Sequence, residues 1–213
     1  MQNAPCQMPH LRCAFCIEPY FGHAAFTVLE LLFAVTLTVT LGAMATPRLL
    51  GAVDDLRAAG AVRYIATKLQ QGRMEAVSRS AAVGWQFVST TTGYQYAPYL
   101  DGNGNGVRSL EIQRAIDPRI GPIEQLADRF AGVDFGVIPG LPPVDPGGTP
   151  PGTDPIRLGS SSILTFTPLG TSSPGTLYVR GRRGIQYAIR ILGETGKTRV
   201  LKFDPRTRRW KPA

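Results

Sequence analysis

A long apolar run near the N-terminal end of the chain limits what the rest can do. It covers residues 26–45, FTVLELLFAVTLTVTLGAMA, in which Leu, Val, Ala and Phe dominate. About 20 apolar residues are needed for an α-helix to cross the ~30 Å hydrocarbon core of a bilayer. The alternative is a buried core helix, but such a helix usually shows a polar face, and none appears between Leu31 and Ala45. The run therefore predicts a membrane-spanning helix.

One carboxylate, Glu30, lies near the start of this run. A charged side chain near the bilayer centre costs about 2.5–3.5 kcal/mol on insertion scales, and acids found there usually have a function. If the chain were cut after Ala25, the new amine of Phe26 would lie one helical turn from Glu30. Such groups on neighbouring chains could neutralise each other. Thr36 and Thr40 are four residues apart and can bond back to the helix backbone.

The segment before the run does not look like an ordinary secretory signal. Such a signal has a basic start and a small-residue cleavage site after its apolar stretch. Here Ala24 and Ala25 precede the apolar stretch, and the upstream charges of Arg12 and Glu18 cancel. The small residues therefore favour a cut before the apolar run.

The cysteines and histidines also precede residue 26. Cys13 and Cys16 have CxxC spacing, but the segment offers no framework to hold metal ligands. A chain without its first 25 residues has no Cys, no His and no disulfide. It also lacks a G-x-S-x-G or paired-carboxylate signature, so we expect a protein that is not an enzyme and has no resident cofactor.

The sequence from Ala25 to Leu32, AFTVLELL, resembles the prepilin motif of type IV pilins and type II secretion pseudopilins. The resemblance implies that a prepilin peptidase cuts between Ala25 and Phe26 and methylates the amine of Phe26. It also implies that Glu30 pairs with that amine on an adjacent subunit. Pro47 sits where pilins commonly carry a helix-disturbing proline. Ala25 replaces the Gly usually found before the cut.

The chain after Pro47 divides into a helix and a β-rich region. Apolar residues at helical intervals predict an amphipathic half-helix over 47–83, and they are Leu49, Val53, Leu56, Val62, Ile65 and Leu69. Each of four glycines destabilises a helix by about 1 kcal/mol relative to Ala, and they are Gly42, Gly51, Gly60 and Gly72. Alternating patterns then predict strands at 84–88, 94–96, 163–166, 176–179, 185–191 and 199–203.

The expected layout is a leader over 1–25, a transmembrane half-helix over 26–46, the amphipathic half-helix, and a β-rich head over 84–213. The head is expected to be antiparallel, with a hairpin connector at 193–196 and a short helix at 126–130. Residues 139–159 are rich in Pro and Gly and predict a mobile surface loop. The fold class is therefore α+β.

Three head segments narrow the resemblance. They are MEAVSRSAAVGWQF, LTFTPLGTSSPGTLYVR and TGKTRVLKFD, and they resemble the GspH/FimT family of minor pseudopilins and minor pilins. The resemblance implies a head of two β-sheets and a subunit of a type II secretion pseudopilus or a type IV pilus. Its partners would be other pilin or pseudopilin subunits and the peptidase. The protein would cross the inner membrane once, with its head in the periplasm.

The segment from Asp101 to Ile112, DGNGNGVRSLEI, is similar to a calcium-binding loop. Oxygen ligands at alternate positions followed by Gly are typical of such loops. The candidate ligands are Asp101, Asn103, Asn105, Glu111 and Asp117, although the twelfth position is Ile112. The alternative is a Gly/Asn turn that needs positive φ.

The C-terminal segment is basic and predicts a second possible partner. The chain carries a net charge of +8, and Arg206, Arg208, Arg209 and Lys211 surround Trp210 near its end. Basic tails bind nucleic-acid phosphates with steep salt dependence. Some minor pilins of this type bind DNA during uptake, so the resemblance permits DNA binding. A solvated or lipid-facing end is the alternative.

Overall fold

The computed structural model describes residues 27–159 and 161–213. The expected leader and the Ala25 and Phe26 cleavage site lie outside the described residues. The chain divides into two compact units, Met1–Ala45 and Thr46–Ala213. Helix α1 (Val28–Arg79, 52 residues) runs from the first unit into the second and continues through Pro47. It ends four residues before the expected boundary at 83.

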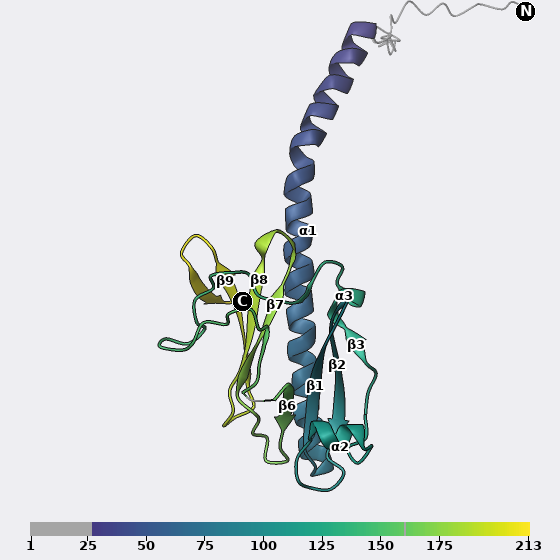
Figure 1. Ribbon diagram of the computed structural model, residues 1–213. Coiled ribbons are helices and arrows are strands. Elements are labelled where there is room, and N and C mark those ends of the chain that lie inside the picture. The colour runs from purple at the N-terminus through teal and green to yellow at the C-terminus, as the bar shows by residue number, and fades with distance from the viewer. Residues whose placement is uncertain (1–26, 160) are drawn as a thin grey trace, which may run out of the picture. The chain divides into compact units, whose positions relative to one another are not determined.

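Two antiparallel sheets follow α1 (Figure 1), which confirms the expected α+β class. The first sheet has the order β3-β2-β1-β6, with β1 Val83–Thr90, β2 Gly93–Leu100, β3 Glu124–Gln125 and β6 Ile163–Phe166. The second has the order β10-β9-β8-β7-β4, and β5 also pairs with β7. Its strands are β4 Asp134–Phe135, β5 Ile156–Arg157, β7 Gly175–Arg180, β8 Gln186–Ile191, β9 Thr198–Asp204 and β10 Arg209–Pro212.

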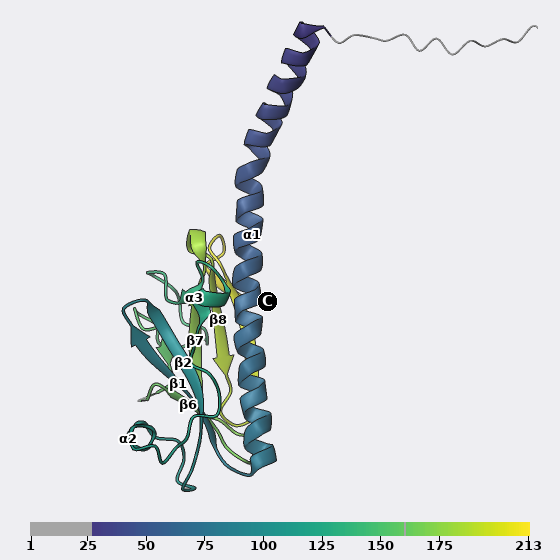
Figure 2. The same ribbon diagram turned by 90° about the vertical axis from the view of Figure 1, so that its right-hand side faces the viewer.

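The main core forms where the two sheets meet the second half of α1 (Figure 2). The helix contributes small and aliphatic side chains that are almost fully buried: Ala58, Ala61, Val62, Ile65, Leu69 and Ala76. The sheets contribute inward-facing residues of alternating strand positions, including Trp85, Leu164 and Ile189. This placement corrects the expected apolar face, because Leu49, Val53 and Leu56 are exposed instead.

The longer strands were predictable from their alternation. β6 has the expected bounds, and β1, β2, β7 and β9 are longer than expected by a few residues. The connector at 193–196 joins β8 to β9, which pair in antiparallel register. The short helix is present as α3 (Leu126–Arg129). Helix α2 (Ser109–Gln113), the 3₁₀ turn η1 (Arg182–Gly184) and strands β3, β4, β5 and β10 were not expected.

The Pro/Gly-rich segment 139–159 is more ordered by contacts than expected. Leu141 is buried in a second cluster with Tyr178, Ala188 and Phe203, on the face of the second sheet opposite the main core. Further on, Ile156 pairs with Leu177 of β7. Gln186 fixes the entry to this segment, because its side chain accepts from Ile138 N–H and donates to the Gly136 carbonyl. The segment therefore covers the sheet rather than extending freely into solvent.

Candidate functional site

The N-terminal part of α1 presents apolar side chains that nothing in its own unit covers. Every residue from Val28 to Leu50 is exposed, including large side chains such as Phe33, of which 69% is accessible. Among the described residues, α1 is the one helix long and apolar enough to cross a membrane, with a mean hydropathy of 2.0 over its most apolar window. Exposing this much apolar surface to water is unfavourable, so the segment needs lipid or neighbouring helices as its environment.

Glu30 lies in the first turn of α1, where a carboxylate also favours the helix dipole. Thr27 caps this turn, because its Oγ1 accepts a hydrogen bond of 3.2 Å from the backbone N–H of Glu30. Within residues 27–159 and 161–213, no Lys or Arg forms an ion pair with the Glu30 carboxylate. No cation of the described residues therefore occupies this carboxylate, and a cation from another molecule can pair with it.

The threonines of the apolar segment satisfy their hydroxyl groups inside the helix, as the sequence predicts. Thr36 Oγ1 donates to the carbonyl of Leu32 at 2.9 Å, and Thr40 Oγ1 donates to that of Thr36 at 2.7 Å. Thr38 does the same with Ala34. Because these hydroxyls need no outside partner, they add little to the cost of placing the segment in hydrocarbon.

The Asp101 loop is closed by two buried carboxylates and backbone donors. Asp101 accepts from the backbone N–H groups of Gly104 at 2.8 Å and Gly106 at 2.7 Å. Asp117, which is 1% exposed, accepts from Gly102 and Arg108. Positive φ values of 79° at Gly104 and 87° at Gly106 are those that a Gly-rich turn requires.

The remaining candidate calcium ligands do not converge on these two carboxylates. The Glu111 carboxylate accepts a hydrogen bond from the side-chain amide of Asn105, and Asn103 accepts from the backbone of Asn105. In the part of the chain that the structure describes, no group of three or more acidic, His or Cys side chains is placed to hold a metal ion. The geometry fits the Gly/Asn turn, and calcium binding by this loop stays a prediction.

The basic C-terminal residues belong to a β-hairpin, so the expected tail is folded. β10 pairs with β9, and the turn between them carries Arg206 and Arg208. Arg208 donates to the carbonyl of Gly140, and Lys211 forms a 2.6 Å ion pair with Asp204. Trp210 packs between Tyr178 and Phe203 and donates to the carbonyl of Pro142, so its ring is not a free aromatic surface beside the basic residues.

Comparison with protein families identifies the family to which the head is similar. The family model described as type II transport protein GspH matches residues 61–196. The chain belongs to the GspH family. Comparison with curated proteins and with solved structures found no match. GspH proteins are pseudopilins, so this chain is a structural protein of the pseudopilin and minor-pilin type, and the family implies association with other such subunits.

The GspH match covers only part of what the sequence predicts. It includes most of the buried part of α1 and the strands up to the β8–β9 connector. The segment with Ala25, Phe26 and Glu30 lies before the match, and the β9–β10 hairpin lies after it. The assembly and processing residues therefore rest on the local motif and on the exposed apolar helix.

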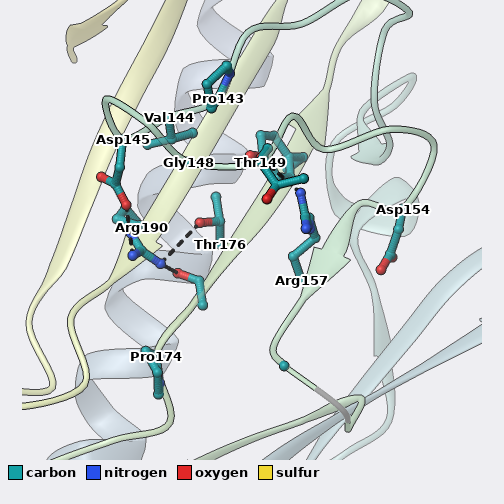
Figure 3. Close-up of a pocket in the computed structure, with 13 residues that line it drawn as sticks. Pro143, Val144, Asp145, Gly148, Thr149, Asp154, Arg157, Pro174, Thr176 and Arg190 are labelled. Atoms are coloured by element: carbon teal, nitrogen blue, oxygen red, sulfur yellow. Dashed lines mark hydrogen bonds and ion pairs between the residues drawn. The ribbon is translucent and has the colours of Figure 1, made fainter.

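A cleft of about 480 Å³ lies on the second sheet, and the Pro/Gly-rich segment forms part of its wall (Figure 3). Its main charged group, Arg190, forms a 2.8 Å ion pair with Asp145 and donates to the carbonyl of Gly175. Arg157 donates to the carbonyls of Thr149 and Pro150. The arginines of this GspH head thus fasten the Pro/Gly-rich segment to the sheet, which is a structural role.

The sequence did not predict one polar contact, which joins α1 to the β7–β8 turn. Asp54 of α1 is buried and pairs with Arg183 at 3.4 Å. Arg183 also donates to the carbonyl of Pro47 at 3.2 Å. The partners are more than 125 residues apart in sequence, so no local signal identifies them. They fix the β7–β8 turn beside the first residues of the second unit.

Proposed function

We propose that this GspH protein is a minor subunit of a type II secretion pseudopilus or a type IV pilus. The observation that carries the proposal is the fully exposed apolar segment of α1, whose one acid has no ion-pair partner among the described residues, joined in one chain to a GspH head. Such a helix can first lie in a bilayer and later pack among the helices of neighbouring subunits. The head then contacts other minor subunits or cargo.

In this proposal a prepilin peptidase removes residues 1–25 and methylates the amine of Phe26. The protein crosses the inner membrane once, with its head in the periplasm, before it enters the filament. Glu30 then meets the Phe26 amine of an adjacent subunit. In a low-dielectric filament core an unpaired carboxylate is costly, whereas a paired one is stabilised, so the contact selects one register between neighbours.

Replacement of Glu30 tests this role. Glu30→Ala is expected to leave membrane insertion intact, because it removes a charge from the spanning segment. The same change is expected to reduce incorporation into the filament at least tenfold, because the Phe26 amine of the neighbour loses its partner. Membrane fractionation measures insertion, and pull-down with another pilin or pseudopilin subunit of the same system measures incorporation.

Thr38→Val is the matched control, since it changes another exposed position of the same segment and its hydroxyl bonds only within the helix. This variant should insert and assemble like the unaltered protein. Normal incorporation of Glu30→Ala would contradict the proposed pairing.

DNA binding during uptake is a second candidate function. Arg206, Arg208 and Arg209 are exposed, and this favours contact with phosphate. The packing of Trp210 counts against it, because a base has no free aromatic face to stack on at that residue. Filament assembly is therefore the function that the residues support best.

A further inference from the structure

The end of the head unit where the chain arrives from the apolar segment can be identified from its contacts. Thr46 and Pro47 are the first residues of that unit. Arg183 in η1 donates to the carbonyl of Pro47 and pairs with Asp54 of α1. The β7–β8 turn therefore lies at this end of the head, which we call the anchor-side end.

The β9–β10 turn lies at the same end. Strand β8 starts at Gln186, just after η1, and β9 runs antiparallel to it, with Tyr187 opposite Lys202. The turn at 205–208 that follows β9 is consequently level with η1. Figures 1 and 2 show the two turns, yellow-green and yellow, side by side at one end of the second sheet. Lys202 also pairs with Asp55 of α1 at 2.9 Å, which holds this corner of the sheet against the helix.

The anchor-side end carries a cluster of exposed guanidinium groups, which we call the arginine rim. Its members are Arg48, Arg182, Arg183, Arg206, Arg208 and Arg209. Of the rim residues, only Arg183 has a carboxylate within 4 Å among the described residues. The nearby acids are already engaged, since Asp55 pairs with Lys202 and Asp204 with Lys211. Apart from Arg183, the arginines of the rim thus form a positive surface that no carboxylate of the described residues neutralises.

We propose that the arginine rim docks on anionic phospholipid head groups of the membrane that holds the anchor. Guanidinium groups bind phosphate oxygens in a bidentate way, and basic residues next to a spanning segment are attracted to anionic lipid. The attraction acts only within a Debye length of about 8 Å at physiological salt, so it needs groups held close to the bilayer. Chain continuity meets this need, because Arg48 follows directly on the spanning segment.

Lipid is favoured over nucleic acid as the occupant for two reasons. The rim adjoins the spanning segment in the chain, so an anionic bilayer surface is the first polyanion it encounters. In addition, the aromatic residue of the hairpin, Trp210, is packed against Phe203 rather than open for stacking. The inference rests on the membrane-anchoring part of the proposed function and adds a consequence to it. A rim docked on lipid holds the head at the membrane until the subunit is extracted.

Energy transfer in lipid nanodiscs tests the docking with the full chain. A donor dye is placed on Thr207→Cys, in a chain whose Cys6, Cys13 and Cys16 are replaced by Ser, and acceptor dye is placed on lipid. Transfer is expected to be higher in discs that contain phosphatidylglycerol than in discs of phosphatidylcholine alone. High salt should return it to the neutral-disc level.

Two variants that each lose two arginines distinguish an effect of the rim itself from an effect of the protein's net charge. R206S/R209S should lose the extra transfer, whereas R114S/R119S, which removes two exposed arginines beside the Asp101 loop, should keep it. Within residues 27–159 and 161–213 the side chains of these four arginines make no hydrogen bond or ion pair, so both variants should fold, and circular dichroism checks this.

Transfer that is independent of lipid charge, or lost equally in both variants, would overturn the proposal. Duplex DNA binding that only R206S/R209S abolishes, without any effect of lipid charge, would assign the rim to nucleic acid instead. Recovery of the protein in discs of neutral lipid measures anchoring by the apolar segment alone. Failure of the rim to dock can therefore be told apart from failure of the segment to anchor.

Discussion

Glu124 in β3 is a single residue that links the first sheet to α1 through its side chain. Its side chain is 10% exposed, and it accepts a 3.0 Å ion-pair contact from Lys68. The hydroxyl groups of Tyr64 and Tyr96 donate to the other carboxylate oxygen, Oε2, and Arg129 lies 3.7 Å from that same oxygen. Burial alone would raise the pKa of Glu124, but the hydrogen bonds from Tyr64 and Lys68 outweigh it and hold that pKa below the ordinary value.

Glu124→Gln is expected to lower the free energy of unfolding by about 1–3 kcal/mol, because hydrogen bonds to a charged acceptor are lost. The pKa of Glu124 is lower in the folded state, so the unfolded chain binds more protons between the two pKa values. Its contribution is fully present above the ordinary value of 4.5 and is lost as the pH falls through the folded pKa. Denaturant titration of the full chain in detergent micelles at several pH values measures both effects.

Glu75→Gln is the control for Glu124, because Glu75 forms an i,i+4 pair with Arg79 on the exposed helix surface. It should change stability by less than about 0.5 kcal/mol. Equal effects of the two substitutions would contradict the role assigned to Glu124.

The sequence predicted a special role for some single residues and not for others. Glu30 stood out because a charged side chain within an apolar run is costly in a bilayer and usually has a function. Glu124 and Asp54 did not, because their partners lie in distant segments and only the tertiary fold brings them together. Local patterns carry no information about such pairs.

The glycines of α1 differ in whether a neighbouring element packs against them. Gly72 is buried, and a Cβ at this position would overlap the indole Nε1 of Trp85 in β1. The glycine therefore lets the first sheet approach the helix closely. At Gly51 the nearest atom to such a Cβ is the end of the Arg183 side chain, at 3.3 Å, which can move.

Gly72→Ala is expected to lower the free energy of unfolding by about 1–3 kcal/mol, because overpacking at the helix–sheet contact outweighs the better helix propensity of Ala. Gly51→Ala should be neutral or stabilising by up to about 1 kcal/mol. Thermal unfolding of the full chain in micelles, followed by Trp fluorescence, compares the two. A stabilising effect of Gly72→Ala would show that the sheet does not approach the helix at this residue.

Elements with a clear period were predictable, and elements defined by their partners were not. The alternation in 163–166 gives β6 with its full bounds, whereas β3, β4 and β5 have two residues each and exist through pairing with β2 or β7. The composition of 139–159 indicated a free loop, but Leu141 finds a hydrophobic site on the second sheet. Composition could not reveal this site, because distant strands form it.

At the scale of the whole molecule, the protein combines a membrane-type helix with a GspH head. The head has its own core, so it does not need the apolar segment for burial, and that segment is left for lipid and for neighbouring subunits. The sequence indicated this division through the change of pattern at Pro47. It did not indicate the arginine rim, whose members come from three separate segments of the chain.

The mature N-terminus tests the central claim most directly, because pairing with Glu30 needs a free amine at Phe26. Mass spectrometry of the protein isolated from membranes of its native host should find a chain that begins at Phe26 with a methylated amine. Coexpression with an inactive prepilin peptidase should leave the cut unmade. A chain that still carries residues 1–25 when its peptidase is active would contradict the account.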